Sequence, residues 1–205
     1  MVREMNNEIK VILIGGSPMS GKTTLAKMLS SDLKFSNIST DDIGVILQTV
    51  VDINPMKGFD YREYYIKRSL EDLIIDILEY HRRIFPAIER LIEIHSTWGN
   101  PIIIEGWALY PSMLKKFNNA NIQKLWLACS ENVFEKRLYE DIDFYKGASD
   151  EDFMKDKYLK RSLWHNNKIL NECTEFDEKV IRIDENTDIK NTLEFVKGVI
   201  LNREE

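Results

Sequence analysis

Eight residues near the start of the chain have the composition and spacing of a phosphate-binding loop. The run Gly16-Ser17-Pro18-Met19-Ser20-Gly21-Lys22-Thr23 fits the pattern G-x-x-x-x-G-K-[ST]. An apolar segment, residues 10–14, precedes it, and a helix-like segment, residues 24–29, follows it. Because this motif requires a strand before it and a helix after it, pattern and context together predict a nucleotide-binding P-loop.

The residue types of this loop suit a polyphosphate. Glycines let the backbone turn tightly so that successive N–H groups point inward, and the following helix adds a partial positive charge at its N-terminus. Lys22 can reach the β- and γ-phosphates, and the Thr23 hydroxyl is placed to ligate Mg²⁺. The residues expected to hold the nucleotide are Gly16, Ser17, Met19, Ser20, Gly21, Lys22, Thr23 and Thr24.

An acidic pair follows the second strand-like segment. In Ser39-Thr40-Asp41-Asp42 a carboxylate is expected to project from the carboxyl edge of the sheet toward the crevice. Phosphoryl transfer needs a group that orients the attacking hydroxyl, and Asp41 is our candidate general base. Alternatively, Asp41 holds Mg²⁺ through water or caps a helix that begins near Ile43. Asp42 is the better candidate for a residue that acts only as a cap.

Glu105 is the third candidate near the metal. It follows the apolar run of residues 101–104, where a carboxylate can orient the water shell of a metal beside Thr23. Alternatively, Glu105 contacts the substrate, or it is a residue at the end of a strand whose hydrogen bonds are satisfied within the protein. The predicted metal site therefore consists of Thr23, Asp41 and Glu105.

Arg137 and Arg161 flank an acidic segment with little periodicity, which we predict to be a lid over about residues 139–162. A simple surface loop is the alternative. Arginine is well suited to bind phosphate because it is always charged. The competing interpretation pairs these arginines with Glu140 or Asp156 on exposed helix faces.

Five short apolar runs, separated by helix-like segments, predict an α/β fold with a mostly parallel sheet and helices on both faces. The runs are residues 10–14, 36–39, 101–104, 122–128 and 179–183. Over residues 70–92 apolar side chains recur at helical spacing, and Pro86 predicts a kink or two successive helices. Side chains just before this helix are expected to border a substrate pocket: Tyr61, Arg62, Tyr64, Tyr65 and Lys67.

Length and composition favour one globular domain over residues 1–205. The net charge of −6 disfavours a nucleic-acid partner and favours a small-molecule phosphate acceptor. No apolar stretch approaches the length of a membrane span, and residues 1–8 lack the apolar core of a secretion signal, so we expect a cytoplasmic protein. Cys129 and Cys173 predict buried thiols, and a monomer and a homodimer are both open.

Three parts of the chain resemble the small P-loop kinases, most closely the 2-phosphoglycerate kinase type. They are the P-loop, Ile38-Ser39-Thr40-Asp41, and Ile103-Ile104-Glu105-Gly106-Trp107 followed by Pro111. Chloramphenicol phosphotransferase, shikimate kinase and gluconate kinase are similar at greater distance. The resemblance implies a P-loop NTPase three-layer sandwich with strand order 2-3-1-4-5 and a helical lid. It also implies ATP and Mg²⁺, a base at Asp41, and contact of Arg137 with adenine or phosphates.

One position departs from the pattern of that family. An arginine commonly follows T-D-x-[IL], whereas Thr40-Asp41-Asp42-Ile43 is followed by Gly44. A substrate phosphate would thereby lose a ligand, for which Arg62 or Lys67 can compensate. The acceptor implied by the resemblance, 2-phosphoglycerate, is one named candidate.

The predicted function is ATP-dependent transfer of the γ-phosphate to a hydroxyl of a small molecule, with catalytic roles for Lys22, Asp41, Arg137 and Arg161. One alternative is a kinase acting on nucleosides, nucleotides or nucleic-acid ends, and another is a P-loop ATPase or GTPase switch. The run Asn167-Lys168-Ile169-Leu170 lacks the aspartate of the guanine-reading N-K-x-D motif, which disfavours the GTPase.

Overall fold

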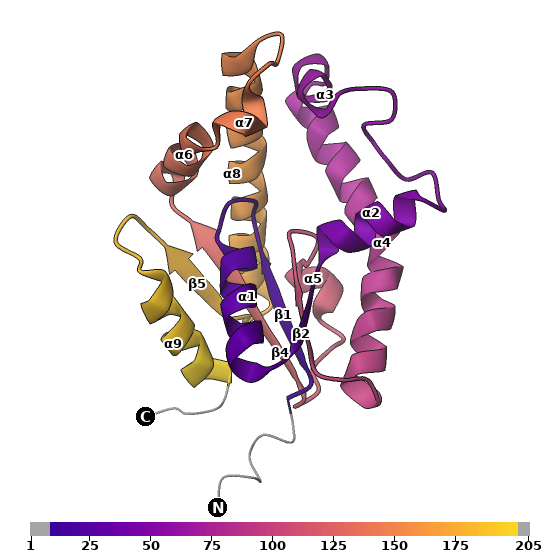
Figure 1. The fold of residues 1–205 in the computed structure, drawn as a ribbon, viewed down its shortest axis with the longest axis vertical. Helices are drawn as coiled ribbons and strands as arrows, with labels where there is room; N and C mark the ends of the chain where they lie inside the picture. The colour runs from indigo at the N-terminus through magenta and orange to yellow at the C-terminus, as the bar shows by residue number, and fades with distance from the viewer. Residues whose placement is uncertain (1–8, 201–205) are drawn as a thin grey trace, which may run out of the picture.

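Five strands form one parallel sheet at the centre of the computed structural model, which describes residues 9–200 (Figure 1). The segment 1–8, where no secretion signal is expected, lies outside the described residues. The strand order is β2-β3-β1-β4-β5, and every neighbouring pair is parallel, which confirms the expected topology. The strands are β1 (Val11–Gly16), β2 (Ser36–Ser39), β3 (Ile102–Glu105), β4 (Ile122–Cys129) and β5 (Val180–Ile183).

Helices cover both faces of the sheet, as the alternation of segments predicts. On one face α1 and α9 pack together, and on the other α4, α5 and α8 contribute to a second core (Figure 1). The helices are α1 (Lys22–Leu33), α2 (Thr40–Gln48), α3 (Tyr61–Lys67), α4 (Leu70–Thr97), α5 (Pro111–Leu114), α6 (Glu131–Glu140), α7 (Ile142–Tyr145), α8 (Glu151–Glu175) and α9 (Ile189–Ile200).

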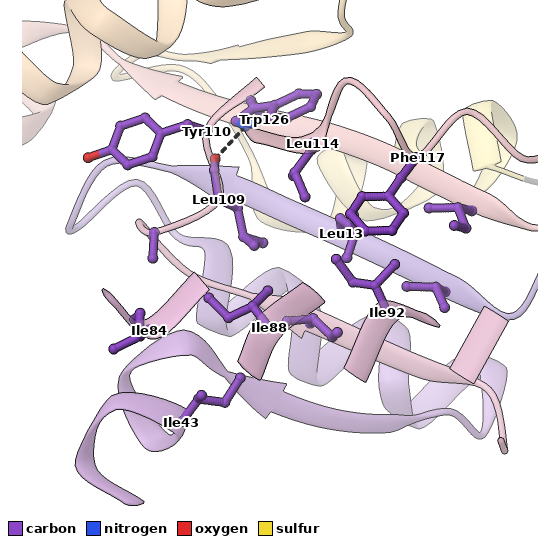
Figure 2. Packing of buried hydrophobic residues seen from close by; sticks show 14 of the residues in the cluster. Leu13, Ile43, Ile84, Ile88, Ile92, Leu109, Tyr110, Leu114, Phe117 and Trp126 are labelled. Atoms are coloured by element: carbon purple, nitrogen blue, oxygen red, sulfur yellow. Dashed lines mark hydrogen bonds between the residues drawn. The ribbon is translucent and has the colours of Figure 1, made fainter. Parts of the chain in front are cut away.

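Alternate residues of the buried strands feed the two cores. In β1, Leu13 faces the core under α4, whereas Ile12 and Ile14 face the core under α1. Figure 2 shows the core under α4, where Ile88 lies fully buried and the Trp126 indole N–H donates to the Leu109 carbonyl oxygen over 2.8 Å. Because both faces of the central strands are buried, β1 and β3 are apolar along most of their length. The edge strands β2 and β5 are partly exposed and carry polar residues.

Helix α4 continues through Pro86 without interruption, so the expectation of two successive helices is wrong. A proline inside a helix removes one backbone donor and crowds the preceding turn. Here the apolar stripe of the same helix, which includes Ile84, Ile88 and Ile92, is fully buried against the sheet. Burial of this stripe on both sides of the proline outweighs the cost of the lost hydrogen bond.

A third cluster of buried side chains joins α3 to α6, α7 and α8 beyond the carboxyl ends of the strands. This is the upper part of the molecule in Figure 1, where α3 and α7 face each other. Tyr65 of α3, Tyr145 of α7 and Tyr158 of α8 belong to this cluster. It therefore encloses the edge of the sheet at which the P-loop lies.

Two predictions from the sequence, on the cysteines and on membrane-spanning segments, can be compared with the described residues. Cys129 and Cys173 are buried free thiols, as predicted. Among residues 9–200, none of the helices combines the length and apolar character that a membrane crossing needs.

Truncation of the α4 stripe tests this account of the fold. We expect Ile88→Ala to lower the free energy of unfolding by about 2–5 kcal/mol, because it leaves a cavity between α4 and the sheet. The matched control is Ile75→Ala on the same helix, where the side chain is 55% exposed and the loss should stay within about 0.5 kcal/mol. Urea denaturation measures both values, and equal losses would contradict the assignment of the buried face.

Candidate active site

The P-loop joins β1 to α1 in the conformation that a phosphate requires. Gly21 caps α1 with φ of 94°, and Met19 also has a positive φ of 60°. A Cβ on Gly16 would lie 2.3 Å from the Leu127 carbonyl oxygen, so only glycine allows this approach to β4. Within residues 9–200 no side chain caps α1, so its first amide groups are available to an anion.

Lys22 lies buried beneath the loop. Its Nζ donates to the Ser17 carbonyl oxygen over 2.6 Å and lies 3.5 Å from the Ser20 hydroxyl. Burial lowers the pKa of Lys22 to about 8, although the nearby carboxylates of Glu105 and Asp41 oppose this shift. Any additional negative charge beside Lys22 would therefore stabilise the charged form of its side chain.

Thr23 and Glu105 meet at the ends of α1 and β3. The Thr23 hydroxyl donates to Oε1 of Glu105 over 2.9 Å, and Glu105 is only 3% exposed. Burial raises the pKa of Glu105, while Lys22 and the Thr23 hydrogen bond act in the opposite direction. With Asp41 on the same cavity, these residues offer the hard oxygen ligands that Mg²⁺ prefers.

The described part of the chain has no cluster of three or more metal-ligating His, Cys, Asp or Glu side chains. A magnesium ion that is held by one or two carboxylates together with substrate phosphates does not need such a cluster. The oxygen set of Thr23, Glu105 and Asp41 therefore fits a nucleotide-bound Mg²⁺ better than a metal held by protein alone.

Asp41 is free of any capping role. Helix α2 begins at Thr40, and Ser39 caps it through a reciprocal pair of hydrogen bonds with Asp42, at 2.9 and 3.4 Å. The capping role of Asp42 is confirmed, whereas a cap formed by Asp41 is wrong. Instead, Oδ1 of Asp41 accepts a hydrogen bond of 2.7 Å from the Trp107 indole N–H.

The candidate catalytic residues and a group of aromatic side chains line one cavity with a volume of about 470 Å³. One wall carries Lys22, Thr23, Asp41 and Glu105. A second group of lining side chains, the aromatic wall, includes Tyr61, Tyr64, Tyr65, Tyr80, Phe144 and Tyr158. This volume is in the range of small-molecule binding sites.

Two basic residues that were expected to border the pocket do not line it. Arg62 donates to the Asp143 carbonyl oxygen over 3.0 Å, and the Lys67 ammonium lies 5.4 Å from the centre of the Phe59 ring. Neither is among the residues that line the cavity, whereas their neighbours Tyr61, Tyr64 and Tyr65 are.

The two predicted arginines lie in different places. Arg137 donates through Nη1 to the Met19 carbonyl oxygen of the P-loop over 2.5 Å and is not among the residues that line the cavity. Arg161 is 6% exposed and lines the cavity. Neither is paired with Glu140 or Asp156 among the described residues, and Asp156 instead bonds Lys160. The interpretation as exposed helix-face ion pairs is therefore wrong.

The predicted lid, residues 139–162, consists of the end of α6, the short helix α7, a connecting loop and the first half of α8. It is attached to α3. The Tyr61 hydroxyl donates to the Phe144 carbonyl oxygen over 2.7 Å, and the Ser149 amide donates to Glu63 over 3.0 Å. In this arrangement Phe144, Tyr158 and Arg161 of the segment line the cavity, and the motion of the segment remains a prediction.

Comparison with known proteins identifies the fold. No protein-family model and no curated protein matches this sequence. A shikimate kinase structure from Acinetobacter baumannii is 13% identical with a TM-score of 0.57, covering 96% of this chain and 95% of that chain. A gluconokinase from Sinorhizobium meliloti 1021 is 14% identical with a TM-score of 0.55 over 96% and 93%. A deoxyadenosine kinase from M. mycoides is 15% identical with a TM-score of 0.51 over 93% and 98%.

The chain has the fold of the small P-loop kinases. The resemblance to shikimate and gluconate kinases is confirmed at the level of the fold. None of these three structures is a 2-phosphoglycerate kinase, so that closer resemblance remains a prediction.

Within this P-loop kinase fold, two side chains that the sequence analysis did not place in the site support it. Trp107 bonds Asp41 and stacks on Arg161, and its carbonyl oxygen lies 2.9 Å from Nε2 of His165. The Asn166 side-chain oxygen accepts from the Ser17 hydroxyl over 3.1 Å. For Trp107, the available signal in the sequence was its position two residues after Glu105. No local signal marks Asn166, which lies within α8.

The lowered pKa of Lys22 predicts proton uptake on nucleotide binding. At pH 8.5 the amine of the free protein is largely neutral, and an adjacent triphosphate raises its pKa, so MgATP binding should take up most of one proton. Uptake should fall toward pH 7, where Lys22 is already charged. Calorimetry in two buffers of different ionisation enthalpy measures this quantity. Lys22→Met should remove the uptake, and its persistence in that variant would contradict the assignment.

Proposed function

We propose that this protein is a kinase that transfers the γ-phosphate of ATP to a hydroxyl group of a small molecule. The observation that carries the proposal is the convergence of Lys22, Thr23, Asp41 and Glu105 on one cavity, beside the uncapped N-terminus of α1. The shared fold with shikimate kinase and gluconokinase structures supports a small hydroxyl-bearing acceptor.

The P-loop amides and Lys22 would hold the β- and γ-phosphates in position. Phosphoryl transfer depends mainly on such positioning and on charge stabilisation. The P-loop is suited to this because its backbone N–H groups are fixed by the fold before the nucleotide binds.

Asp41 would orient the acceptor hydroxyl and accept its proton. Its carboxylate lines the same cavity as Lys22, and the Trp107 indole N–H holds one of its oxygens. General base catalysis of this kind contributes typically about 10²- to 10⁴-fold.

Thr23 and Glu105 would hold Mg²⁺ together with the nucleotide phosphates, with Asp41 able to reach it through water. When bound, the ion neutralises part of the charge on the phosphate oxygens. Arg137, next to the Met19 carbonyl oxygen, would contact the nucleotide on the outer side of the loop.

A nucleoside is the second candidate acceptor. The aromatic wall of the cavity favours it, because a base stacks on aromatic side chains. The fold is also shared with a deoxyadenosine kinase structure. A screen of acceptors for ADP release distinguishes a nucleoside from a non-aromatic metabolite, and 2-phosphoglycerate is one of the acceptors to be tested.

Acceptor-dependent release of ADP tests the proposed function. A screen of hydroxyl-bearing metabolites and nucleosides should find an acceptor that raises ADP release above the rate of ATP hydrolysis without acceptor. Lys22→Ala should abolish this turnover. Asp41→Asn should lower kcat by about 10²- to 10⁴-fold with nearly unchanged affinity for MgATP. ATP hydrolysis that no acceptor alters would instead support an ATPase switch.

Trp107→Phe tests the positioning of Asp41. The substitution removes an N–H donor to a carboxylate and should lower kcat about tenfold to hundredfold, since a hydrogen bond to a charged group contributes about 1.5–3 kcal/mol. In an Asp41→Asn background the same substitution should cost much less, because the two residues act as a unit. Additive losses in the double variant would show that Trp107 acts independently of Asp41.

A further inference from the structure

The side chain of Asn166 is buried beneath α8 and makes three hydrogen bonds to two distant parts of the chain. Its Oδ1 accepts from the Ser17 hydroxyl over 3.1 Å and from the Cys129 amide over 3.0 Å. Its Nδ2 donates to the Cys129 carbonyl oxygen over 3.2 Å. Asn166 is 4% exposed, so water does not compete freely for these bonds. One side chain of α8 therefore joins the P-loop to the end of β4.

Two of these bonds extend the sheet by one step beyond the end of β1. The Ser130 amide donates to the last residue of β5, so the main-chain groups of Cys129, one residue earlier, face the side of β1. The pairing of β1 with β4 ends at Gly16, opposite Leu127. The carboxamide of Asn166 thus supplies the donor and the acceptor that a further peptide group of β1 would have offered to Cys129.

The main chain of Cys129 fixes the orientation of this carboxamide. An amide N–H can only donate and a carbonyl oxygen can only accept, so Oδ1 of Asn166 must face the former and Nδ2 the latter. The remaining acceptor site of Oδ1 is then directed to the hydroxyl of Ser17, a fully buried residue. Asn166 therefore transmits the fixed position of the sheet to Ser17.

Ser17 is the second residue of the P-loop, and a second interaction also holds it. Its carbonyl oxygen accepts from Nζ of Lys22 over 2.6 Å. A bound nucleotide would draw this ammonium group toward its phosphates, and the Ser17 carbonyl oxygen would then lose the bond. The hydrogen bond between the Ser17 hydroxyl and Asn166 does not involve Lys22, so it can hold the loop in both states.

We propose that Asn166 is a positioning residue for nucleotide binding, which holds Ser17 so that the P-loop amides are already in place when the phosphates arrive. The inference rests on the proposed function and adds a residue outside the P-loop motif to its nucleotide site. Donors that are fixed in advance need no rearrangement on binding, which favours affinity. Because Asn166 lies on α8, the affinity for the nucleotide depends on the placement of that helix.

Hydrogen–deuterium exchange tests the positioning of the loop without a nucleotide. Asn166→Leu removes all three hydrogen bonds with a side chain of similar size, so the peptide over residues 15–23 should exchange faster than in the parent protein. Asn166→Ser should show the same effect, and it leaves room for a water molecule that can pair with Cys129, so it serves where Asn166→Leu does not fold. Asn167→Leu, at the exposed neighbouring position, is the matched control and should exchange like the parent.

Calorimetry with MgATP tests the consequence for binding. Asn166→Leu and Asn166→Ser should each bind MgATP about tenfold or more weakly than the parent, whereas Asn167→Leu should bind it equally well. Ser17→Ala removes one of the same hydrogen bonds from the other side. In the double variant Asn166→Ser with Ser17→Ala, the loss of affinity should be clearly smaller than the two single losses combined, because both substitutions break one interaction.

Two results would overturn the proposal. One is a lower unfolding temperature of the Asn166 variants with parent-like exchange of the P-loop and parent-like affinity for MgATP, which would make Asn166 a structural residue of the sheet only. The other is a fully additive loss in the double variant, which would show that Asn166 does not act through Ser17. If the parent protein does not bind MgATP, the proposed function is refuted, while the exchange measurement still decides whether Asn166 positions the loop.

Discussion

The site is organised around one buried ammonium group at the carboxyl edge of a parallel sheet. Lys22 lies below the P-loop, where burial disfavours its charge and the Ser17 carbonyl oxygen and two nearby carboxylates offset part of that cost. Glu105 at the end of β3 and Asp41 at the start of α2 supply those carboxylates. The parallel sheet makes this possible, because the ends of neighbouring strands meet at the same edge.

Helix α8 connects the nucleotide side of the site to the acceptor side. Arg161, His165 and Asn166 lie within about one and a half turns of it, and each has a different partner. Arg161 faces the aromatic wall, His165 holds the Trp107 carbonyl oxygen, and Asn166 bonds the Ser17 hydroxyl and the Cys129 amide. A rotation of this helix would therefore disturb both ends of the cavity together.

Local patterns predicted the elements of the fold well and the neighbours of individual side chains poorly. The five strands and the capping role of Asp42 follow from apolar runs and short-range hydrogen bonds, which depend on residues close in sequence. At Pro86 the prediction of two successive helices was wrong because the burial of the surrounding helix exceeds the local cost of the proline, and a kink there stays a prediction. The two arginines show the same limit, since one lies part-buried on α6 against the P-loop and the other is buried among aromatic rings.

The sequence by itself determined the P-loop, the order of strands and helices, and the set of residue types available for phosphate and magnesium chemistry. Those features depend on contiguous residues and on the periodicity of apolar side chains. Only the tertiary structure decided that Trp107 joins Asp41 to Arg161, and that Arg161 has no counter-ion among the described residues. Burial and pairing of a charge depend on which distant segments pack around it, and no local spacing encodes that arrangement.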